Sequence, residues 1–325
     1  MKTYSLKKYQ PELKLAWDDF VRKSKNGTFL FQRDFMDYHQ HRFDDFSLLL
    51  YKKEQLIAIL PANRVGNAVH SHQGLTYGGL LLSPEIKFKT VLEGLKTLLK
   101  FLHQQQLNYL WLKEIPSIYH RVPSEEVHYF NFILEAQLVQ RDALSVIDNK
   151  HKIKLSKSRL EGITRGKKHD LRVVHDDNFK LFWNSVLIPN LRTKHQVEPV
   201  HSLAEIQYLK GKFPEHIKQF NVYHNDAIVA GATIFETPQV AHCQYISGNV
   251  DKNSLGSLDL LHEMLINEMF PDTPYFDFGT SNGHQGLNIN QGLQFWKEGF
   301  GARTLTQDTY KIETKNYRKL AAVLQ

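Results

Sequence analysis

The chain has 325 residues, with 41 Lys and Arg against 34 Asp and Glu, and its net charge is +7 with histidine neutral. At roughly 100–200 residues per domain, this length predicts two domains or one large one. Hydrophobic residues at 42% and charged residues at 23% are typical of globular chains and exclude wholesale disorder. The single cysteine, Cys243, excludes a disulfide framework and a cysteine-built metal site. The modest positive charge would favour an anionic partner such as a CoA phosphate, a nucleotide sugar or RNA.

The sequence contains no segment that predicts membrane insertion or export. No apolar run approaches the roughly 18 residues that a membrane helix needs. The N-terminal residues 1–8 carry positive charges but lack the apolar core of a secretory signal. We therefore expect a cytoplasmic protein.

Hydrophobic periodicity predicts the same series of elements in each half of the chain. The series is an opening helix, a hairpin, a strand, an amphipathic helix, a strand and, after a further helix, a closing strand. In the first half these are residues 17–21, 48–58, 75–78, 91–102, 108–112 and 141–146. In the second half they are residues 179–186, 220–230, 243–246, 258–269, 274–278 and 307–312.

The constant offset between these elements indicates internal duplication. The hairpins start 172 positions apart (48 and 220), and the closing strands start 166 positions apart (141 and 307). Hairpins combined with a helical crossover predict an α/β fold of mixed sheets covered by helices. We expect domains at 1–149 and 173–325, joined by a basic helix at 150–172. This segment has nine Lys or Arg, which fits an RNA-binding surface or a solvated linker.

Two common catalytic signatures are absent: the sequence has no H-E-x-x-H and no G-x-x-x-x-G-K-[ST], and no G-x-G-x-x-G follows a predicted strand. The H-x-H pairs at 39–41 and 70–72 have no acidic cluster beside them. We therefore expect no metal site.

A polar loop after the strand at 243–246 is the first candidate site. A strand, a loop of small residues and a helix start together predict an anion site at the helix N-terminus, suited to a phosphate or pyrophosphate. A capped helix without a ligand would show the same pattern. The candidate donor-binding residues are Tyr245, Ile246, Ser247, Ser254, Gly256 and Ser257.

The second candidate site is the Gly- and Asn-rich block 276–302, because a strand that ends in such a loop can form a binding site at a sheet edge. Asp277 and His284 are candidate bases by their location, although both could simply hydrogen-bond the loop. Lys297 corresponds to Asn131 in the first half, so only the second half has a cation there.

These motifs resemble the FemAB-like branch of the GNAT acyltransferase superfamily, which consists of tandem GNAT domains and has many bacterial members. The likeness covers nearly the whole chain, and its most specific part is Phe-Trp-Lys-Glu-Gly-Phe-Gly at 295–301. Asp-Phe-Gly at 277–279, the basic helix around 159–168 and Tyr-Gly-Gly at 77–79 are similar to further family elements.

The resemblance implies transfer of an acyl group, with acetyl expected, from an activated carrier to an amine. Lys297 would then stabilise the oxyanion that forms, with Trp296 beside the transferring ester and Asp277 as the third catalytic candidate. The implied acceptor is a small-molecule amine, an amino sugar or a peptide, with Tyr77, Gly78, Asn282 and His284 as candidate contacts.

The implied donor is an acyl-CoA, although residues 253–258 keep only one glycine of the family's pyrophosphate loop. The first alternative is an aminoacyl-tRNA-dependent peptidoglycan aminoacyltransferase that contacts tRNA through residues 150–172. The second alternative is a ligand-binding module whose catalytic site has decayed. The oligomeric state is left open by the sequence.

Overall fold

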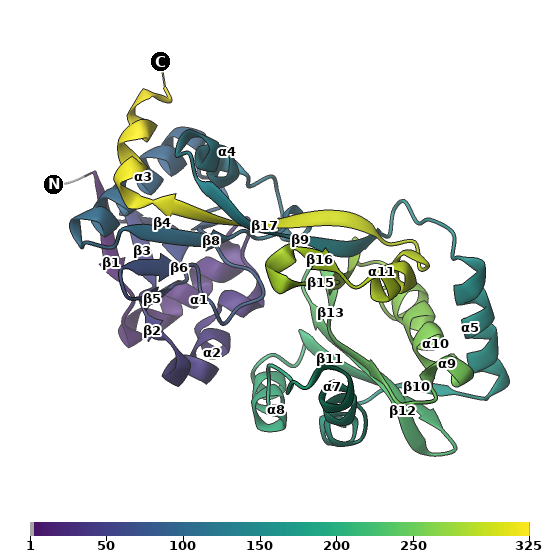
Figure 1. The fold of residues 1–325 in the computed structure, drawn as a ribbon. Helices are drawn as coiled ribbons and strands as arrows, with labels where there is room; N and C mark the ends of the chain where they lie inside the picture. The colour runs from purple at the N-terminus through teal and green to yellow at the C-terminus, as the bar shows by residue number, and fades with distance from the viewer. Residues whose placement is uncertain (1–2, 325) are drawn as a thin grey trace. The chain divides into compact units, whose positions relative to one another are not determined.

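The computed structural model describes residues 3–324, which form two compact units (Figure 1). Unit 1 contains the chain up to Asp142 together with the segment from Thr306 onward, and unit 2 is Ala143–Leu305. Strands β9 (Gln137–Asp148) and β17 (Arg303–Glu313) carry the chain between the units. Among the described residues, no helix combines the length and hydropathy needed to cross a bilayer.

Unit 1 contains two small sheets. One has the strand order β1-β3-β4-β7, and the other contains β17-β8-β6-β5-β2. The strands are β1 (Tyr4–Lys8), β2 (Asp44–Asp45), β3 (Leu48–Lys52), β4 (Gln55–Leu60), β5 (Asn63–Val65), β6 (Ala68–His70), β7 (Leu81–Leu82) and β8 (Tyr109–Lys113). The helices are α1 (Lys14–Lys23), α2 (Arg33–Met36), α3 (Phe88–Gln104), α4 (Glu126–Ile133) and the C-terminal 3-10 segment η8 (Thr314–Ala322).

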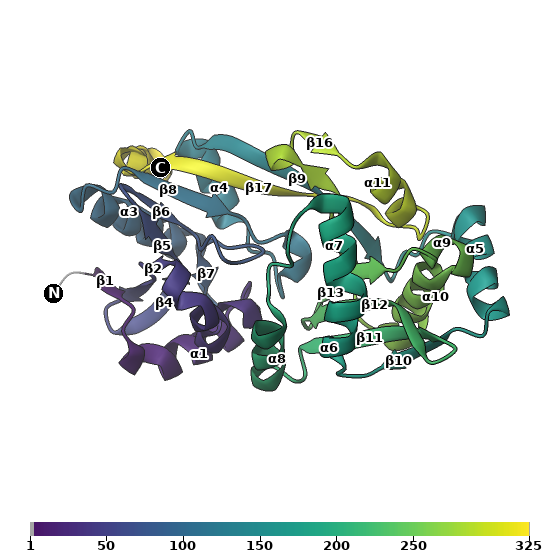
Figure 2. The same cartoon turned by 60° about the horizontal axis from the view of Figure 1, so that its bottom comes forward.

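Helix α3 supplies much of the unit 1 core because its apolar residues recur at helical spacing and face the sheet. Leu95, Leu98 and Leu102 are all buried there, and η8 packs beside the same helix (Figure 2). Ile312 and Leu320 belong to this core cluster as well. The C-terminal segment is therefore part of unit 1 by its packing.

Unit 2 contains a sheet with the strand order β10-β11-β12-β13-β14-β9. Its strands are β10 (Arg172–His175), β11 (Ile217–His224), β12 (Ala227–Glu236), β13 (Val240–Gly248) and β14 (Tyr275–Thr280), with a separate ribbon of β15 (Asn282–Gly283) and β16 (Asn288–Ile289). The helices are α5 (Lys157–Lys168), α6 (Phe179–Phe182), α7 (Ile188–His195), α8 (Leu203–Lys212), α9 (Lys252–Leu255), α10 (Ser257–Met264) and α11 (Gln291–Glu298).

Strands β13 and β14 are parallel, but they pair only at their first residues. The register joins Val240 to Tyr275 and ends where His242 faces Asp277. Beyond that point both strands continue without a ladder between them, so they splay apart. Helix α10 packs on β12 and β13, and α5 lies beside α10 in both views (Figures 1 and 2).

The element order repeats in the two units, which confirms the predicted tandem α/β fold. Both hairpins form, β3–β4 with β8 following α3, and β11–β12 with β14 following α10. The prediction of a strand at 75–78 is wrong. There the chain turns at His72 (φ 65°) and again at Gly79 (φ 104°), and neither conformation continues a strand.

The compact units depart from the predicted domain boundaries at both ends of the second half. Residues 306–324 pack in unit 1, as the burial of Ile312 and Leu320 requires. The basic segment does form a helix, α5, and it packs in unit 2, where Ile163 joins the core cluster. Residues 306–324 therefore belong to unit 1 and α5 to unit 2, although the repeat predicts the first segment in the second domain and the other as a separate linker.

Candidate functional site in unit 2

Lys297 lies inside unit 2, with only 2% of its surface exposed. It comes from α11, and its Nζ donates to the carbonyl oxygens of Gly279 at 3.0 Å and Thr280 at 2.8 Å. These carbonyls belong to the end of β14, beyond the last residue paired with β13. The ammonium group is therefore held at the point where the two strands splay.

The backbone at the end of β14 is shaped by Asp277 and Gly279. Asp277 is 1% exposed; one carboxylate oxygen accepts from the backbone N–H of Gly279 at 2.7 Å, and the other lies 2.9 Å from His242 Nδ1. Gly279 has φ 68°, a conformation that favours glycine. This turn directs the carbonyls of Gly279 and Thr280 toward Lys297.

Burial lowers the pKa of Lys297 to about 8, although Asp277 and Cys243 oppose the shift. The side chain is therefore mostly an ammonium at neutral pH but gives up its proton more readily than a surface lysine. Burial also raises the pKa of the Cys243 thiol, with Asp277 adding to the shift, so this thiol is a poor nucleophile.

Trp296, next to Lys297, is fixed by a link to helix α10. Its indole N–H donates to Asp259 at 2.9 Å, and Arg159 of α5 forms an ion pair with the same carboxylate at 2.5 Å. Burial raises the pKa of Asp259, while Trp296 and Arg159 oppose that rise. The basic helix therefore holds the tryptophan in position through one shared carboxylate.

The predicted anion site at the start of α10 is covered by helix α5. A methyl group on Gly256 would lie 2.0 Å from the carbonyl oxygen of Gly162, and one on Gly162 would lie 1.7 Å from Asp259. Such close approach is open only to glycine on both helices. Ser257 is fully buried, whereas Ser254 is exposed and bonds the carbonyl of Asp251.

The other candidate donor residues, on β13, face the interior of unit 2. The hydroxyl of Tyr245 accepts from the backbone N–H of His201 at 3.0 Å and lies 2.6 Å from its Nδ1. Ser247 is 2% exposed, and Ile246 packs against the core cluster. These side chains fix the loop before α8 and the sheet interior.

The candidate acceptor residues of unit 2 lie in the loop between β14 and α11. The side chain of Asn282 holds this loop together. Its Nδ2 donates to the carbonyls of Gly286 and Asn288, and its Oδ1 accepts from the backbone N–H of Ala143 at 2.7 Å. His284 is exposed and has φ 46°. The loop thus brings His284 to the surface, away from buried Asp277.

In unit 1, Tyr77 lies in the interior and Gly78 lines a pocket. Tyr77 is 2% exposed and donates its hydroxyl proton to Thr28 at 3.1 Å. Gly78 donates its N–H to the carbonyl of Lys113 at 2.7 Å and contributes to the pocket wall. Of these two candidate acceptor residues, Gly78 lines the pocket and Tyr77 does not.

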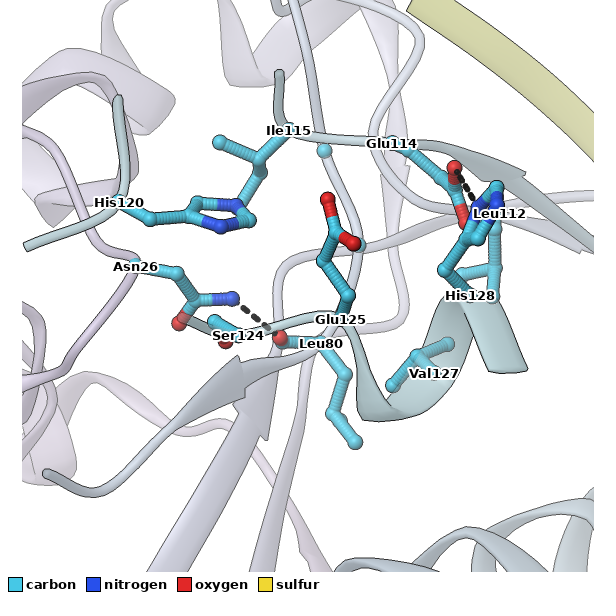
Figure 3. A pocket seen from close by; sticks show the side chains of 12 residues that line it. Asn26, Leu80, Leu112, Glu114, Ile115, His120, Ser124, Glu125, Val127 and His128 are labelled. Atoms are coloured by element: carbon cyan, nitrogen blue, oxygen red, sulfur yellow. Dashed lines mark hydrogen bonds and ion pairs between the residues drawn. The ribbon is translucent and has the colours of Figure 1, made fainter. Parts of the chain in front are cut away.

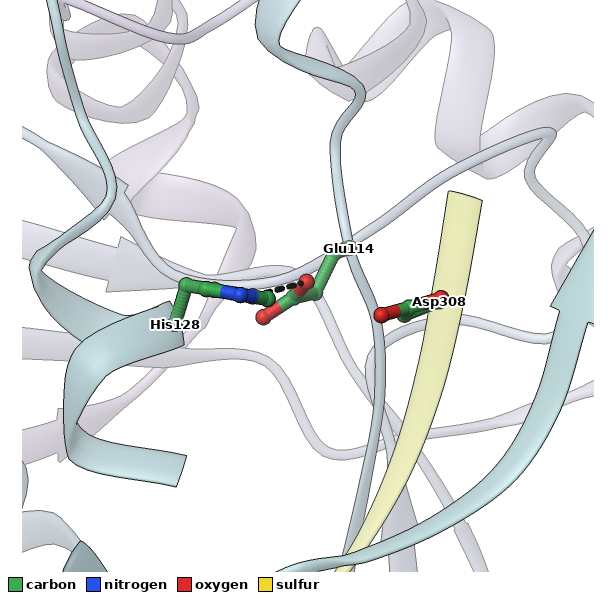
Figure 4. A group of neighbouring side chains, drawn as sticks. All are labelled: Glu114, His128 and Asp308. Atoms are coloured by element: carbon green, nitrogen blue, oxygen red, sulfur yellow. Dashed lines mark hydrogen bonds and ion pairs between the residues drawn. The ribbon is translucent and has the colours of Figure 1, made fainter. Parts of the chain in front are cut away.

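Sequence reasoning missed a cluster at the end of β8 in unit 1, formed by Glu114, His128 and Asp308 (Figure 4). Glu114 lies 2.9 Å from His128 Nδ1 and also accepts from Asn131 Nδ2 at 2.9 Å. Burial raises the pKa of Glu114, and the bond from His128 opposes this rise. The signal that could have indicated it is Glu114 itself, an acidic residue directly after an apolar strand and two residues before a proline.

The three side chains of this cluster place ligand atoms within 4.8 Å of one another, a set that could hold a divalent cation. Both carboxylate oxygens of Asp308, however, accept from Arg141, at 2.6 and 2.7 Å. Burial alone would raise the pKa of Asp308, but Arg141 and Tyr310 outweigh it and lower that pKa. Asp308 is therefore paired with the guanidinium group of Arg141. We interpret the cluster as a proton-binding pair formed by Glu114 and His128.

Models of known protein families and curated protein sequences give no match to the chain. Solved structures share its fold. FemX is similar with a TM-score of 0.66 at 10% identity, over 97% of this chain and 99% of that one. The C-terminal domain of a putative lysylphosphatidylglycerol synthetase from Agrobacterium fabrum is similar with a TM-score of 0.59 at 11% identity, over 95% of both chains.

A tandem GNAT protein from the clavulanic acid biosynthesis pathway is also similar, with a TM-score of 0.50 at 10% identity over 96% of this chain and 98% of that one. The duplicated units therefore define a tandem GNAT fold. Within that class, the chain has the fold of the FemAB-like branch, as the motifs at 277–279 and 295–301 predicted.

Proposed function

We propose that the chain is an N-acyltransferase that moves an acyl group from an activated carrier to an amine. The observation that carries this proposal is the buried ammonium of Lys297 at the splay of β13 and β14. A buried cation costs free energy unless it is compensated, and its partners here are two neutral carbonyls and a carboxylate that already has other partners. A cation kept under those conditions is suited to stabilising negative charge that develops during a reaction.

In the proposed reaction, the amine nitrogen attacks the acyl carbonyl and forms a C–N bond. The carbonyl oxygen becomes an oxyanion, then the bond from the acyl carbon to the sulfur or oxygen of the carrier breaks. The amine proton passes to a base and from the base to the departing sulfur or oxygen, so the carrier leaves as its thiol or alcohol. Lys297 has three N–H groups and uses two on Gly279 and Thr280 within the described residues, so one is left for the oxyanion.

Within unit 1, the Glu114–His128 pair is the candidate for exchanging a proton with an amine bound in that unit. Burial raises the pKa of the Glu114 carboxyl, so this group holds a proton more readily than an exposed glutamate does. The pKa of His128 is raised as well: burial lowers it, but the bond to Glu114 prevails. Asp277 is a weaker candidate, because His242 and the N–H of Gly279 already occupy its oxygens.

The acyl donor has two candidates, acyl-CoA and aminoacyl-tRNA. Helix α5 packs on the N-terminus of α10, where a pyrophosphate was expected, and this favours the tRNA ester. The cations of α5 that remain exposed also favour it, because phosphate contacts dominate RNA affinity. They are Lys157, Arg165, Lys167 and Lys168. Both donors are made in the cytoplasm, where we expect the protein to act.

The test measures transfer from acetyl-CoA and from aminoacyl-tRNA to a panel of amines, amino sugars and peptides by mass spectrometry. We expect Lys297→Met to lower turnover by about tenfold or more, equal to about 1.4 kcal/mol of barrier. Lys100→Met, an exposed position on α3, is the matched control. Unchanged turnover in Lys297→Met would remove the lysine from the mechanism. If neither carrier binds in a calorimetric titration, a ligand-binding module without catalysis is the better description.

A further inference from the structure

Unit 1 contains a pocket that begins beside the Glu114–His128 pair and extends away from it (Figure 3). Its walls are the end of β8, the backbone of residues 78–80 and the segment 120–128 that leads into α4. It encloses about 470 Å³, its open mouth included. Asn26 donates to the carbonyl of Leu80 at 3.0 Å and so braces one wall. Gly79 has φ 104° with nothing within 4 Å of a Cβ position, so the wall has no side chain at this point.

Two buried polar atoms of this pocket lack a hydrogen-bond partner among residues 3–324. One is the hydroxyl oxygen of Ser124, a residue only 8% exposed, and the other is Nδ1 of His120. A buried polar group without a partner costs free energy, commonly about 1–3 kcal/mol. Since both residues line open space, a bound ligand is the simplest source of the missing partners.

The chemistry of the two atoms favours a hydrogen-bond donor as the ligand. Burial lowers the pKa of His120, and the ring bonds the backbone at Ile115, which opposes that shift. The ring is therefore neutral near pH 7 with Nδ1 free to accept. The hydroxyl of Ser124 can accept too. Both atoms thus suit the N–H groups of an ammonium ion.

The charges around the pocket favour a cation as well. The carboxylate of Glu125 stands between the His120 ring and the Glu114–His128 pair in Figure 3. The nearby cation Lys25 is paired with Glu126 at 2.5 Å, so it does not offset Glu125. The positive end of α4 would attract an anion, but Glu125 and Glu126 already occupy that end. An anionic ligand would meet two carboxylates, Glu114 and Glu125.

We propose that the acceptor is a diamine whose second nitrogen binds as an ammonium ion to Ser124, His120 and Glu125. This inference rests on the proposed function, because it names the amine that the reaction takes. Within the pocket, the first nitrogen lies beside Glu114 and His128. The two sets of groups lie in one pocket, so a single short chain with an amine at each end can reach both. A monoamine has one nitrogen and can engage only one of the two sets.

The test is calorimetric titration with α,ω-diamines from 1,2-diaminoethane to 1,6-diaminohexane, against monoamines of the same lengths. We expect at least one diamine to bind about tenfold tighter than its monoamine, which is about 1.4 kcal/mol. Glu125→Gln and Ser124→Ala should reduce that preference to about twofold or less, whereas Glu85→Gln, an exposed control, should retain it. Equal binding of every diamine and its monoamine, or a preference unchanged in Glu125→Gln and Ser124→Ala, would overturn the inference.

The same titrations on Lys297→Met separate this inference from the proposed function. Lys297 belongs to unit 2, so we expect the variant to bind the diamine as the unmodified chain does. Diamine preference without transfer from either donor would reject acyl transfer and keep the ammonium site. Transfer to monoamines and diamines at equal kcat/KM would reject the diamine and keep acyl transfer.

Discussion

The Nζ of Lys297 lies 2.8 Å from the carbonyl oxygen of Thr280, so the last turn of α11 is attached to the end of β14 by a buried cation. A helix residue thereby reaches the backbone of a strand at the point where that strand has lost its parallel partner. The contact satisfies a carbonyl that β13 no longer reaches. It also places a charge where the sheet opens, so one side chain serves both packing and the proposed chemistry.

The lowered pKa of Lys297 makes stability depend on pH in a defined direction. The folded-state pKa is about 8 and the ordinary value is 10.5. Between these values the unfolded chain binds more protons than the folded one, so stability rises with pH. We expect the unfolding free energy of the unmodified chain, minus that of Lys297→Met, to increase from about pH 8 to about pH 10 in urea titrations. A constant difference would mean that the lysine is not held as a buried cation.

The close contact of α5 with α10 predicts an unusual sensitivity at Gly162. A methyl group there would lie 1.7 Å from Asp259, so Gly162→Ala must push the helices apart. We expect a loss of about 1–3 kcal/mol in unfolding free energy. Gly211→Ala in α8 is the matched control, because nothing lies within 4 Å of its Cβ position. There the gain in helix propensity should add about 0.5–1 kcal/mol. Equal effects at the two glycines would contradict the packing.

The sequence predicted the tandem fold because each unit repeats strong local signals. The hairpins at 48–58 and 220–230 have apolar strands on both sides of a short polar turn, and the leucines of α3 recur at helical spacing. These signals are local, so they do not depend on which unit a segment joins. The placement of residues 306–324 does depend on it, since Ile312 and Leu320 are buried by residues far away in the sequence.

The candidate sites were harder to predict for a similar reason. Ser254, Gly256 and Ser257 have the composition of an anion-binding loop, but the glycines of α5 that cover it lie about ninety residues earlier in the chain. Tyr245 looked available at a strand end, yet His201 lies against its hydroxyl. Glu114 and His128 give no motif, because β8 and α4 bring them together only in the fold.

The link from Arg159 through Asp259 to Trp296 predicts that Asp259 positions the indole. Asp259→Asn can still accept from the indole N–H, whereas Asp259→Ala leaves both Trp296 and half-buried Arg159 without that carboxylate. We expect Asp259→Ala to cost about 3–5 kcal/mol of unfolding free energy, the usual loss for breaking a buried pair. The measurement is kcat and KM for each variant, with kcat partly restored in Asp259→Asn. Asp19→Ala, at an exposed ion pair, should leave stability nearly unchanged.

Should Asp259→Asn and Asp259→Ala have the same kcat, Asp259 would serve stability alone. A positioning role requires the two variants to differ in kcat even after they are compared at a temperature where both are folded. An asparagine oxygen can still accept from the indole N–H, as Asp259 does at 2.9 Å, but asparagine lacks the charge that pairs with Arg159. The size of the rescue therefore measures how much that bond contributes.

Glu114 and Asp308 lie in one cluster, but their pKa values shift in opposite directions, so acid titration should separate them. Burial raises the pKa of Glu114 above 4.5, so the folded state holds its proton longer and stability falls as pH rises through that range. For Asp308, burial is outweighed by Arg141 and Tyr310, and its pKa falls below 3.8; stability then rises as pH passes upward through this lower range. Relative to the unmodified chain, Glu114→Gln should gain stability as pH rises above 4.5, the ordinary value for glutamate, whereas Asp308→Asn should lose stability as pH rises toward 3.8, the ordinary value for aspartate. Chemical denaturation across these ranges, with Glu85→Gln as control, checks both slopes. Parallel slopes for the two variants would show that Arg141 does not distinguish the carboxylates, and would remove Glu114 as a proton-exchanging group of unit 1.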